Sequence, residues 1–162
     1  RSNAQNRYVP NFSYGKGKIV WNFESVNMPA GTDGFLYLNG DTWHWNGAAN
    51  GAGWIQIRIY PQDSTTKSSF KLHYDWTAEE FTLEESMNDI KTIELDTKVD
   101  PEDATKVNVT FSINGKVYYS GKKHNAFDLD GHKGVIFYSG FSGPFSPECT
   151  IVFKSLDYEV YE

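Results

Sequence analysis

Apolar and polar residues alternate with a period of two along most of this 162-residue chain. Residues 54–60 show the pattern most clearly, because isoleucine occupies every second position. The positions between the isoleucines hold Trp54, Gln56, Arg58 and Tyr60. In a strand, this alternation presents the isoleucines to a core and the other residues to the opposite face. About ten segments of this kind are expected as strands: 18–23, 34–39, 41–46, 54–60, 69–75, 91–99, 106–113, 116–120, 134–139 and 150–160.

Turn signals separate these segments. Asn39-Gly40 and Asn114-Gly115 each lie between two of them, and an Asn-Gly pair in that position predicts a tight β-hairpin. Thr77 and Glu80 match a helix-capping pattern, but no helical stripe follows, so residues 78–88 are expected to form a loop or a strand.

The predicted fold is an all-β, antiparallel, two-sheet jelly-roll β-sandwich over residues 18–162, and a lipocalin-like barrel is the alternative. Ser2-Asn3-Ala4 resembles the remnant of a removed expression tag, so residues 1–4 are set apart from the domain. Residues 5–17 are polar and aromatic without a period. They are expected to form an N-terminal lead-in to the first strand.

Charge and cysteine content narrow the partners and the location. The net charge is −6, and no basic stripe is present to neutralise phosphates, so no binding to nucleic acid is expected. No apolar run is long enough to span a membrane, so no transmembrane segment is expected. Cys149 is the single cysteine, which fits a bacterial exported protein better than a disulfide-rich animal ectodomain. An extracellular, periplasmic or cell-surface location is therefore expected, with the leader removed from this chain.

Three of the five tryptophans fall within twelve positions, at Trp43, Trp45 and Trp54. An indole face covers the apolar C–H face of a sugar ring, while amide and imidazole groups bind its hydroxyls. The alternative is that Trp43 and Trp45 fill the core. The candidate ligand-binding residues share aromatic or hydrogen-bonding side chains in or near this cluster: Trp43, His44, Trp45, Asn46, Trp54, Gln56, Arg58 and Trp76.

The C-terminal part of the chain resembles a known superfamily. Residues 107–121 contain an Asn-Gly-Lys hairpin, residues 134–139 read Gly-Val-Ile-Phe-Tyr-Ser, and residues 151–158 form the last strand segment. This order is similar to the end of a concanavalin A-like lectin/glucanase sandwich. The resemblance implies that the last strand pairs back with the first. The superfamily includes laminin G-like modules, carbohydrate-binding modules, lectins and family-16 glucanases, so the resemblance implies a fold more strongly than a function.

A glycoside hydrolase needs a pair of carboxyl groups flanking the scissile bond. Family-16 glucanases carry theirs as Glu-x-Asp-x-x-Glu on one strand. Here Glu94 and Asp96 match the first two positions, but Val99 stands at the third. Glu94 and Asp96 are therefore expected on a solvated outer face, and no catalytic residue is predicted.

Calcium is the one cofactor that the sequence suggests. Asp128 and Asp130 lie two apart before Gly131, and carboxylates in short loops are typical calcium ligands. The remaining ligands of a full calcium loop are missing, so a turn capped by Asp130 is the favoured interpretation.

Two classes of function remain. The first is non-catalytic binding of a glycan or polysaccharide through exposed tryptophans, by a monomeric exported domain. The second is a protein-interaction or structural module of a surface or adhesin complex. A hydrolase or lyase is the third and weakest interpretation, because no pair of acids stands out.

Overall fold

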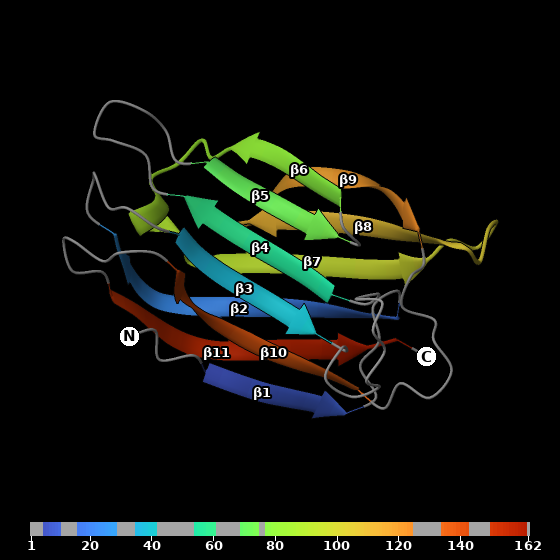
Figure 1. Cartoon of the computed structure of the whole chain (residues 1–162), viewed down its shortest axis with the longest axis horizontal. Coiled ribbons are helices and arrows are strands. Elements are labelled where there is room, and N and C mark those ends of the chain that lie inside the picture. The colour runs from blue at the N-terminus through green and yellow to red at the C-terminus, as the bar shows by residue number, and fades with distance from the viewer. Residues whose placement is uncertain are drawn as a thin grey trace.

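Strand residues with a two-residue period build two antiparallel sheets, which stack face to face in a computed structural model of the chain (Figure 1). The structure describes residues 5–10, 16–28, 35–41, 54–60, 69–74, 77–124, 134–142 and 150–161, with side chains within 17–28, 80–122 and 150–161. In the described residues the one helical element is a 3₁₀ turn, η1 (Met87–Asp89). The prediction of an all-β antiparallel sandwich is confirmed.

The first sheet has six strands in the order β1-β10-β3-β4-β5-β6, and every neighbouring pair is antiparallel. Its strands are β1 (Gln5–Pro10), β10 (Gly134–Ser142), β3 (Phe35–Asp41), β4 (Trp54–Tyr60), β5 (Ser69–Tyr74) and β6 (Thr77–Thr82). Four of them, β3 to β6, follow one another in sequence and lie side by side.

The second sheet has five strands in the order β11-β2-β7-β8-β9, also antiparallel throughout. Its strands are β11 (Thr150–Val160), β2 (Lys16–Asn27), β7 (Thr92–Val99), β8 (Lys106–Ile113) and β9 (Lys116–His124). The last strand pairs with Lys16–Asn27, the first of the sequence-predicted strands, as the resemblance implied.

Two sequence predictions about local structure are wrong. Asn39-Gly40 is not a hairpin turn: both residues lie within β3, between β10 and β4, so ladder pairing on both sides keeps them extended. Residues 5–17 are not an irregular lead-in, because Gln5–Pro10 pairs with Gly134–Ser139 of β10 as the edge strand β1, and β2 already begins at Lys16. An edge strand needs only one partner, and this one forms without a clear two-residue period.

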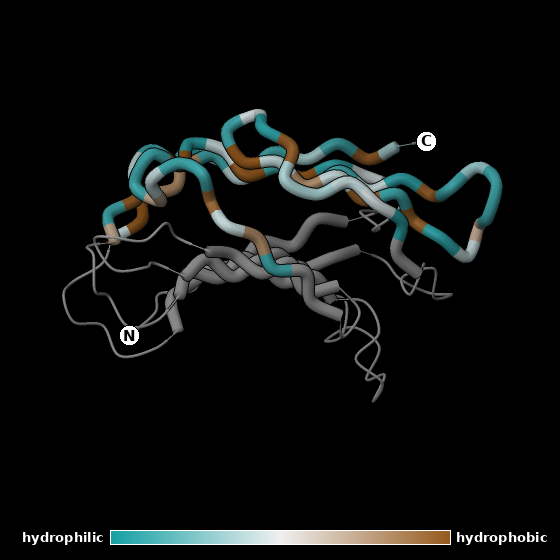
Figure 2. The backbone as a smooth tube through the Cα atoms, turned by 90° about the horizontal axis from the view of Figure 1, so that it is seen from above, coloured by the Kyte–Doolittle hydropathy of each residue, from teal (hydrophilic) through white to brown (hydrophobic). Residues whose placement is uncertain are grey.

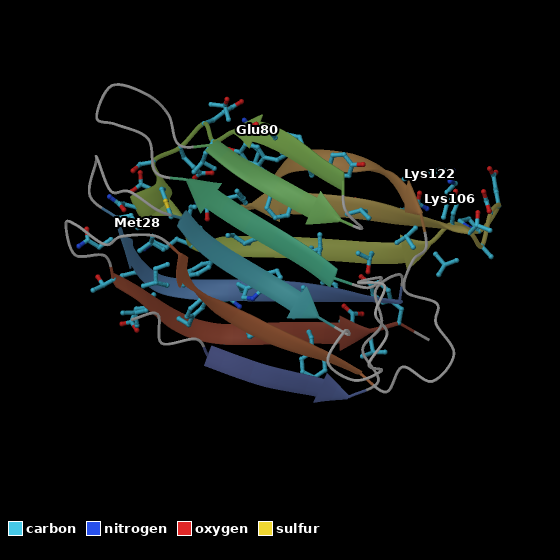
Figure 3. All side chains as sticks on the ribbon, in the orientation of Figure 1. Met28, Glu80, Lys106 and Lys122 are labelled. Carbon is cyan, nitrogen blue, oxygen red and sulfur yellow. The ribbon has the colours of Figure 1, made fainter. Side chains whose placement is uncertain are left out.

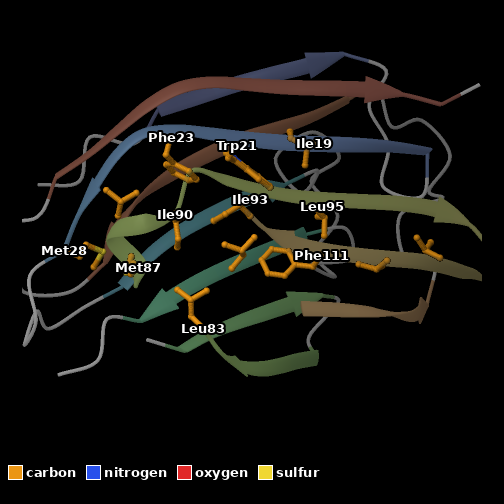
Figure 4. Close-up of a cluster of buried hydrophobic side chains, with 14 residues drawn as sticks. Ile19, Trp21, Phe23, Met28, Leu83, Met87, Ile90, Ile93, Leu95 and Phe111 are labelled. Atoms are coloured by element: carbon orange, nitrogen blue, oxygen red, sulfur yellow. The ribbon is translucent and has the colours of Figure 1, made fainter. Parts of the chain in front are cut away.

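The core lies between the sheets, where alternate residues of β2, β7 and β8 are buried (Figure 4). In β7 and β8, the residues that occupy one phase of the two-residue period are all buried: Ile93, Leu95, Thr97, Val107, Val109, Phe111 and Ile113. Hydrophobic and hydrophilic residues alternate along this sheet in Figure 2. Each large apolar side chain that is fully buried here stabilises the fold by about 1.5–3 kcal/mol, so this layer contributes strongly to stability.

The Asn114-Gly115 turn between β8 and β9 is confirmed. Both residues have positive φ, 49° and 79°, which Asn and Gly tolerate better than other residues. The Asn114 side chain also ties the turn to its surroundings. Its Oδ1 accepts from the backbone N–H groups of Lys91 (2.7 Å) and Thr92 (3.0 Å), and its Nδ2 donates to Glu85 Oε2 (2.6 Å) and the Asp89 carbonyl (2.9 Å).

Phe111→Ala is expected to lower the free energy of unfolding by about 3–5 kcal/mol, because it leaves a cavity in a fully buried site. The matched control is Val117→Ala on β9, whose side chain is exposed, with an expected change below about 0.5 kcal/mol. Urea denaturation measures both. A larger loss for the Val117 variant would contradict the assignment of the core.

Asn114→Gly is expected to cost about 1–2 kcal/mol, since it keeps the positive φ but removes the four side-chain hydrogen bonds. Asn114→Ala is expected to cost about 1–2 kcal/mol more, because alanine is strained in the left-handed region. Urea denaturation of both variants separates the contribution of the side-chain hydrogen bonds from the cost of backbone strain. A Gly115→Ala control tests the same strain next door, where nothing lies within 4 Å of an added Cβ.

Candidate functional site

The two faces of the six-stranded sheet are distinguished at its edge strand β6. Phe81 packs against the core cluster and makes a ring contact with Tyr119 of β9, at 5.9 Å between centroids. Glu80, its neighbour in the strand, is exposed and carries a label in Figure 3. Successive residues of a strand belong to opposite faces. The face that contains the Phe81 position is therefore the core face, and the face that contains the Glu80 position is the outer one.

The antiparallel register extends this assignment across the sheet, because directly paired residues belong to the same face. Glu80 pairs with Lys71, Lys71 with Arg58, Arg58 with Tyr37, and Tyr37 with Gly140. The apolar positions Ile55, Ile57 and Ile59 fall on the core face, as the alternation in the sequence predicted.

The outer face, called the polar face from here on, is rich in residues that recognise polar ligands. Its aromatic, amide, imidazole and charged positions are Asn6, Tyr8, Phe35, Tyr37, Asn39, Asp41, Trp54, Gln56, Arg58, Tyr60, Lys71, His73, Glu80 and Tyr138. Neighbouring positions are about 5 Å apart across the strands and about 7 Å apart along them. The polar face is therefore a grid of hydrogen-bonding and aromatic residues on a regular scaffold.

Three of the residues predicted as ligand-binding lie at positions of this grid. Trp54, Gln56 and Arg58 follow one another on the polar face of β4. The other five, Trp43, His44, Trp45, Asn46 and Trp76, lie outside the described residues, as do Asp128 and Asp130 of the calcium hypothesis. For these residues the sequence prediction stays a prediction.

Several residues of the polar face were missed by the sequence interpretation. Tyr37 and Asn39 on β3 pair directly with Arg58 and Gln56, and His73 on β5 pairs with Gln56 from the other side. Their signal was present, since each occupies the polar phase of its own alternating strand. What the sequence lacked was the order of the strands, which brings β3 and β5 to either side of β4.

Among the described residues, the acidic positions of the polar face are too far apart for a hydrolase pair. In the described strands of this sheet, the polar face has two acidic positions, Asp41 on β3 and Glu80 on β6. Three strand spacings and four residues separate them, or about 19 Å between backbone positions. A glycosidase pair needs a separation of about 5–9.5 Å.

Glu94 and Asp96 belong to the outer face of the other sheet, as predicted, because the residues that alternate with them are buried. Asp96 has a structural role there. Its Oδ1 accepts a hydrogen bond of 2.7 Å from the Tyr161 hydroxyl, and its Oδ2 lies 3.8 Å from Lys98 Nζ. Burial, followed by the hydrogen bond to Asp96, raises the pKa of Tyr161 above its usual value.

A second structural ion pair lies directly after the end of β7. Lys122 on β9, labelled near Lys106 in Figure 3, pairs with Asp100 in the β7–β8 connection. This contact, with a backbone N–H donated by Glu102 at 3.1 Å, holds the pKa of Asp100 below its usual value. Among the residues that the structure describes, no three His, Cys, Asp or Glu side chains gather as metal ligands.

No family model and no curated protein sequence matches this chain. Solved structures do resemble it. The alginate lyase Aly36B, in complex with an alginate trisaccharide, superposes with a TM-score of 0.62 at 10% identity, over 97% of this chain and 75% of that one. An endo-β-galactosidase from Clostridium perfringens gives 0.52 at 13% identity, over 98% and 45%. The laminarinase catalytic domain from Thermotoga maritima gives 0.51 at 14% identity, over 97% and 74%.

Identities this low establish the fold alone. The chain has the concanavalin A-like lectin/glucanase fold, and the resemblance inferred from the sequence is confirmed. A membrane-spanning helix is a separate question. Within the described ranges, no helix has the length and apolar character needed to cross a bilayer.

The raised pKa of Tyr161 predicts a loss of stability at alkaline pH. An unfolded tyrosine ionises near pH 10, where folded Tyr161 still holds its proton, so the unfolded state binds fewer protons. The stabilisation is complete below about pH 10 and is lost as the pH rises towards the folded pKa. Urea denaturation between about pH 9 and 11 is expected to show a steeper loss for the wild type than for Tyr161→Phe. Equal slopes would contradict the raised pKa of Tyr161.

Proposed function

We propose that this chain binds carbohydrate through the polar face without catalysing a reaction. The observation that carries the proposal is the register of β3, β4 and β5, which assembles Trp54, Gln56, Tyr37 and Asn39 on the side of the sheet away from the core. Aromatic groups cover the apolar faces of sugar rings, and amides exchange hydrogen bonds with hydroxyls.

The structural neighbours support the ligand class. The three enzymes with this fold include one solved with an alginate trisaccharide, and their names specify alginate, a galactoside and laminarin as substrates. The shared fold makes a glycan a natural ligand for this chain as well. It does not select which glycan, because one fold supports many sites.

The spacing of acids supports a role without hydrolysis. Asp41 and Glu80 are about 19 Å apart in backbone terms on the polar face. Glu94 and Asp96 belong to the outer face of the opposite sheet, where Asp96 is engaged by Tyr161. In the described strands, the acid pair needed for glycoside hydrolysis is therefore not assembled on the polar face.

The tryptophan cluster would extend this site. Asp41 and Trp54 are register partners, so the segment that joins them leaves from and returns to one end of the polar face. That segment contains Trp43, His44, Trp45 and Asn46. We propose that these residues and Trp76 add further sugar contacts beside Trp54.

A protein-interaction module is the second candidate, and the edge strand β11 is the observation that favours it. Val152, Tyr158 and Val160 on this strand are 45%, 44% and 39% exposed. However, the β11–β2 ladder shifts register twice, between Val152 and Phe153 and between Phe153 and Ser155. Bulges of this kind hinder the addition of another strand at an edge. Carbohydrate binding through the polar face therefore remains the better-supported function.

Trp54→Ala is expected to weaken glycan binding about 5- to 30-fold, because an aromatic anchor contributes about 1–2 kcal/mol. Affinity gel electrophoresis against alginate, laminarin, pectin and galactan measures the change. Tyr158→Ala, which removes an exposed aromatic ring from β11, is the matched control and is expected to bind as the wild type does.

Three results would contradict the proposal. Loss of binding in the Tyr158 variant but not in the Trp54 variant would move the site to β11. Absence of binding to every glycan would remove the function altogether. Release of new reducing ends or unsaturated sugars from a bound polysaccharide would overturn the non-catalytic part.

A further inference from the structure

Two cationic residues occupy directly paired positions of the polar face. Arg58 of β4 pairs directly with Lys71 of β5. Directly opposed residues on one face of an antiparallel pair have their Cβ atoms about 5 Å apart, and like charges in that arrangement destabilise the sheet. The pairing is notable in a chain whose net charge is −6, where most chance neighbours of an arginine would be neutral or acidic.

In the described strands, no acidic position is a direct or diagonal neighbour of Arg58, and the one acid beside the pair is on the Lys71 side. Its direct partner on the other side is Tyr37, and the diagonal positions on both neighbouring strands hold Phe35, Asn39, Ser69 and His73. The nearest acidic position in the described strands is Glu80 on β6, which pairs with Lys71 on β5. The three charged positions together leave a single positive charge, centred on β4 and β5.

We propose that the polar face selects glycans that carry carboxylate groups, that is, uronic acid polysaccharides; this inference rests on the proposed carbohydrate-binding function. The planar guanidinium of arginine matches a carboxylate with two parallel hydrogen bonds, and lysine adds a second charge. A bound carboxylate offsets the repulsion between Arg58 and Lys71. Gln56 and Tyr37, the neighbours of Arg58 along and across the strands, are suited to the hydroxyls of the same sugar.

A carboxylate fits this charge better than a sulfate-rich chain does. One net positive charge in the centre of the grid balances one anion, as in a polymer with a single carboxylate on each sugar. A densely sulfated glycan would bring several negative charges towards a face that also contains Asp41 and Glu80. Repulsion from these acids would oppose its binding.

The test compares polygalacturonate with highly methyl-esterified pectin, which has the same backbone but blocked carboxylates, and with neutral laminarin and chondroitin sulfate. The wild type is expected to bind polygalacturonate at least about tenfold more tightly than the methyl ester, which is the scale of one charge-assisted hydrogen bond. The preference is expected to shrink as salt is raised, since the site is on a solvated face.

Arg58→Gln is expected to abolish this preference while keeping the fold, and its stability is expected to equal or exceed that of the wild type because the like-charge pair is gone. Lys71→Gln is expected to reduce the preference in part. Arg58→Lys keeps the charge but not the planar guanidinium. Its preference for polygalacturonate is expected to lie between those of the wild type and Arg58→Gln. Lys154→Gln on β11, an exposed lysine of the other sheet, is the matched control and should change nothing.

The possible failures are distinguishable. Equal or tighter binding of methyl-esterified pectin or laminarin, or an unchanged preference in Arg58→Gln, overturns the carboxylate inference and leaves carbohydrate binding in place. Tighter binding of chondroitin sulfate than of polygalacturonate overturns the choice of carboxylate over sulfate. Binding to none of the four polysaccharides overturns the proposed function, and this inference with it.

Discussion

The assignment of the polar face depends on the burial of the alternate residues between the two sheets. A strand that slipped by one residue would move its buried residues to the solvent and its polar residues into the core. Ile93, Leu95, Phe111 and their neighbours, all essentially inaccessible to solvent, prevent such a slip in the five-stranded sheet. Phe81 packs against this core, so the same constraint applies to the six-stranded sheet. The strand register then assigns Arg58 and Trp54 to the outer face. The apolar core and the polar face are therefore two results of one constraint.

The two outer faces of the sandwich differ in chemistry. On the outer face of the five-stranded sheet, polar side chains form hydrogen bonds with one another. Asn22 donates to Ser155 (3.0 Å) and Asp157 (2.8 Å), and Tyr161 donates to Asp96. These contacts cross from strand to strand and stabilise the sheet. The outer face of the six-stranded sheet instead has two cationic residues at directly paired positions, and aromatic and amide residues on its central strands. Arrangements that cost stability locally are typical of functional surfaces.

Much of the fold could be predicted from the sequence because periodicity carries it. The bounds of β4, β8 and β11 match the predicted segments, and the Asn114-Gly115 turn forms where the sequence indicated. Asn39-Gly40 is also an Asn-Gly pair but lies in a strand, because pairing with β10 and β4 outweighs the local preference for a turn. β1 could not be predicted, since its stability comes from a partner more than one hundred residues away along the chain.

The candidate site could be predicted only in part for a related reason. Trp54, Gln56 and Arg58 share one strand, so alternation alone placed them together. Lys71 and His73 reach the same face only through the order of the strands, which no local pattern contains. The strand order places Tyr37, Asn39, Lys71 and His73 on the polar face together with Trp54.

The most direct test of a glycan site on the polar face is to map backbone amide chemical shifts by NMR during titration with a uronic acid oligosaccharide. A site on the polar face predicts shifts concentrated in β3, β4 and β5, with β2, β7 and β8 unchanged. Shifts concentrated along β11 and β2, or no shifts for any oligosaccharide, would contradict it.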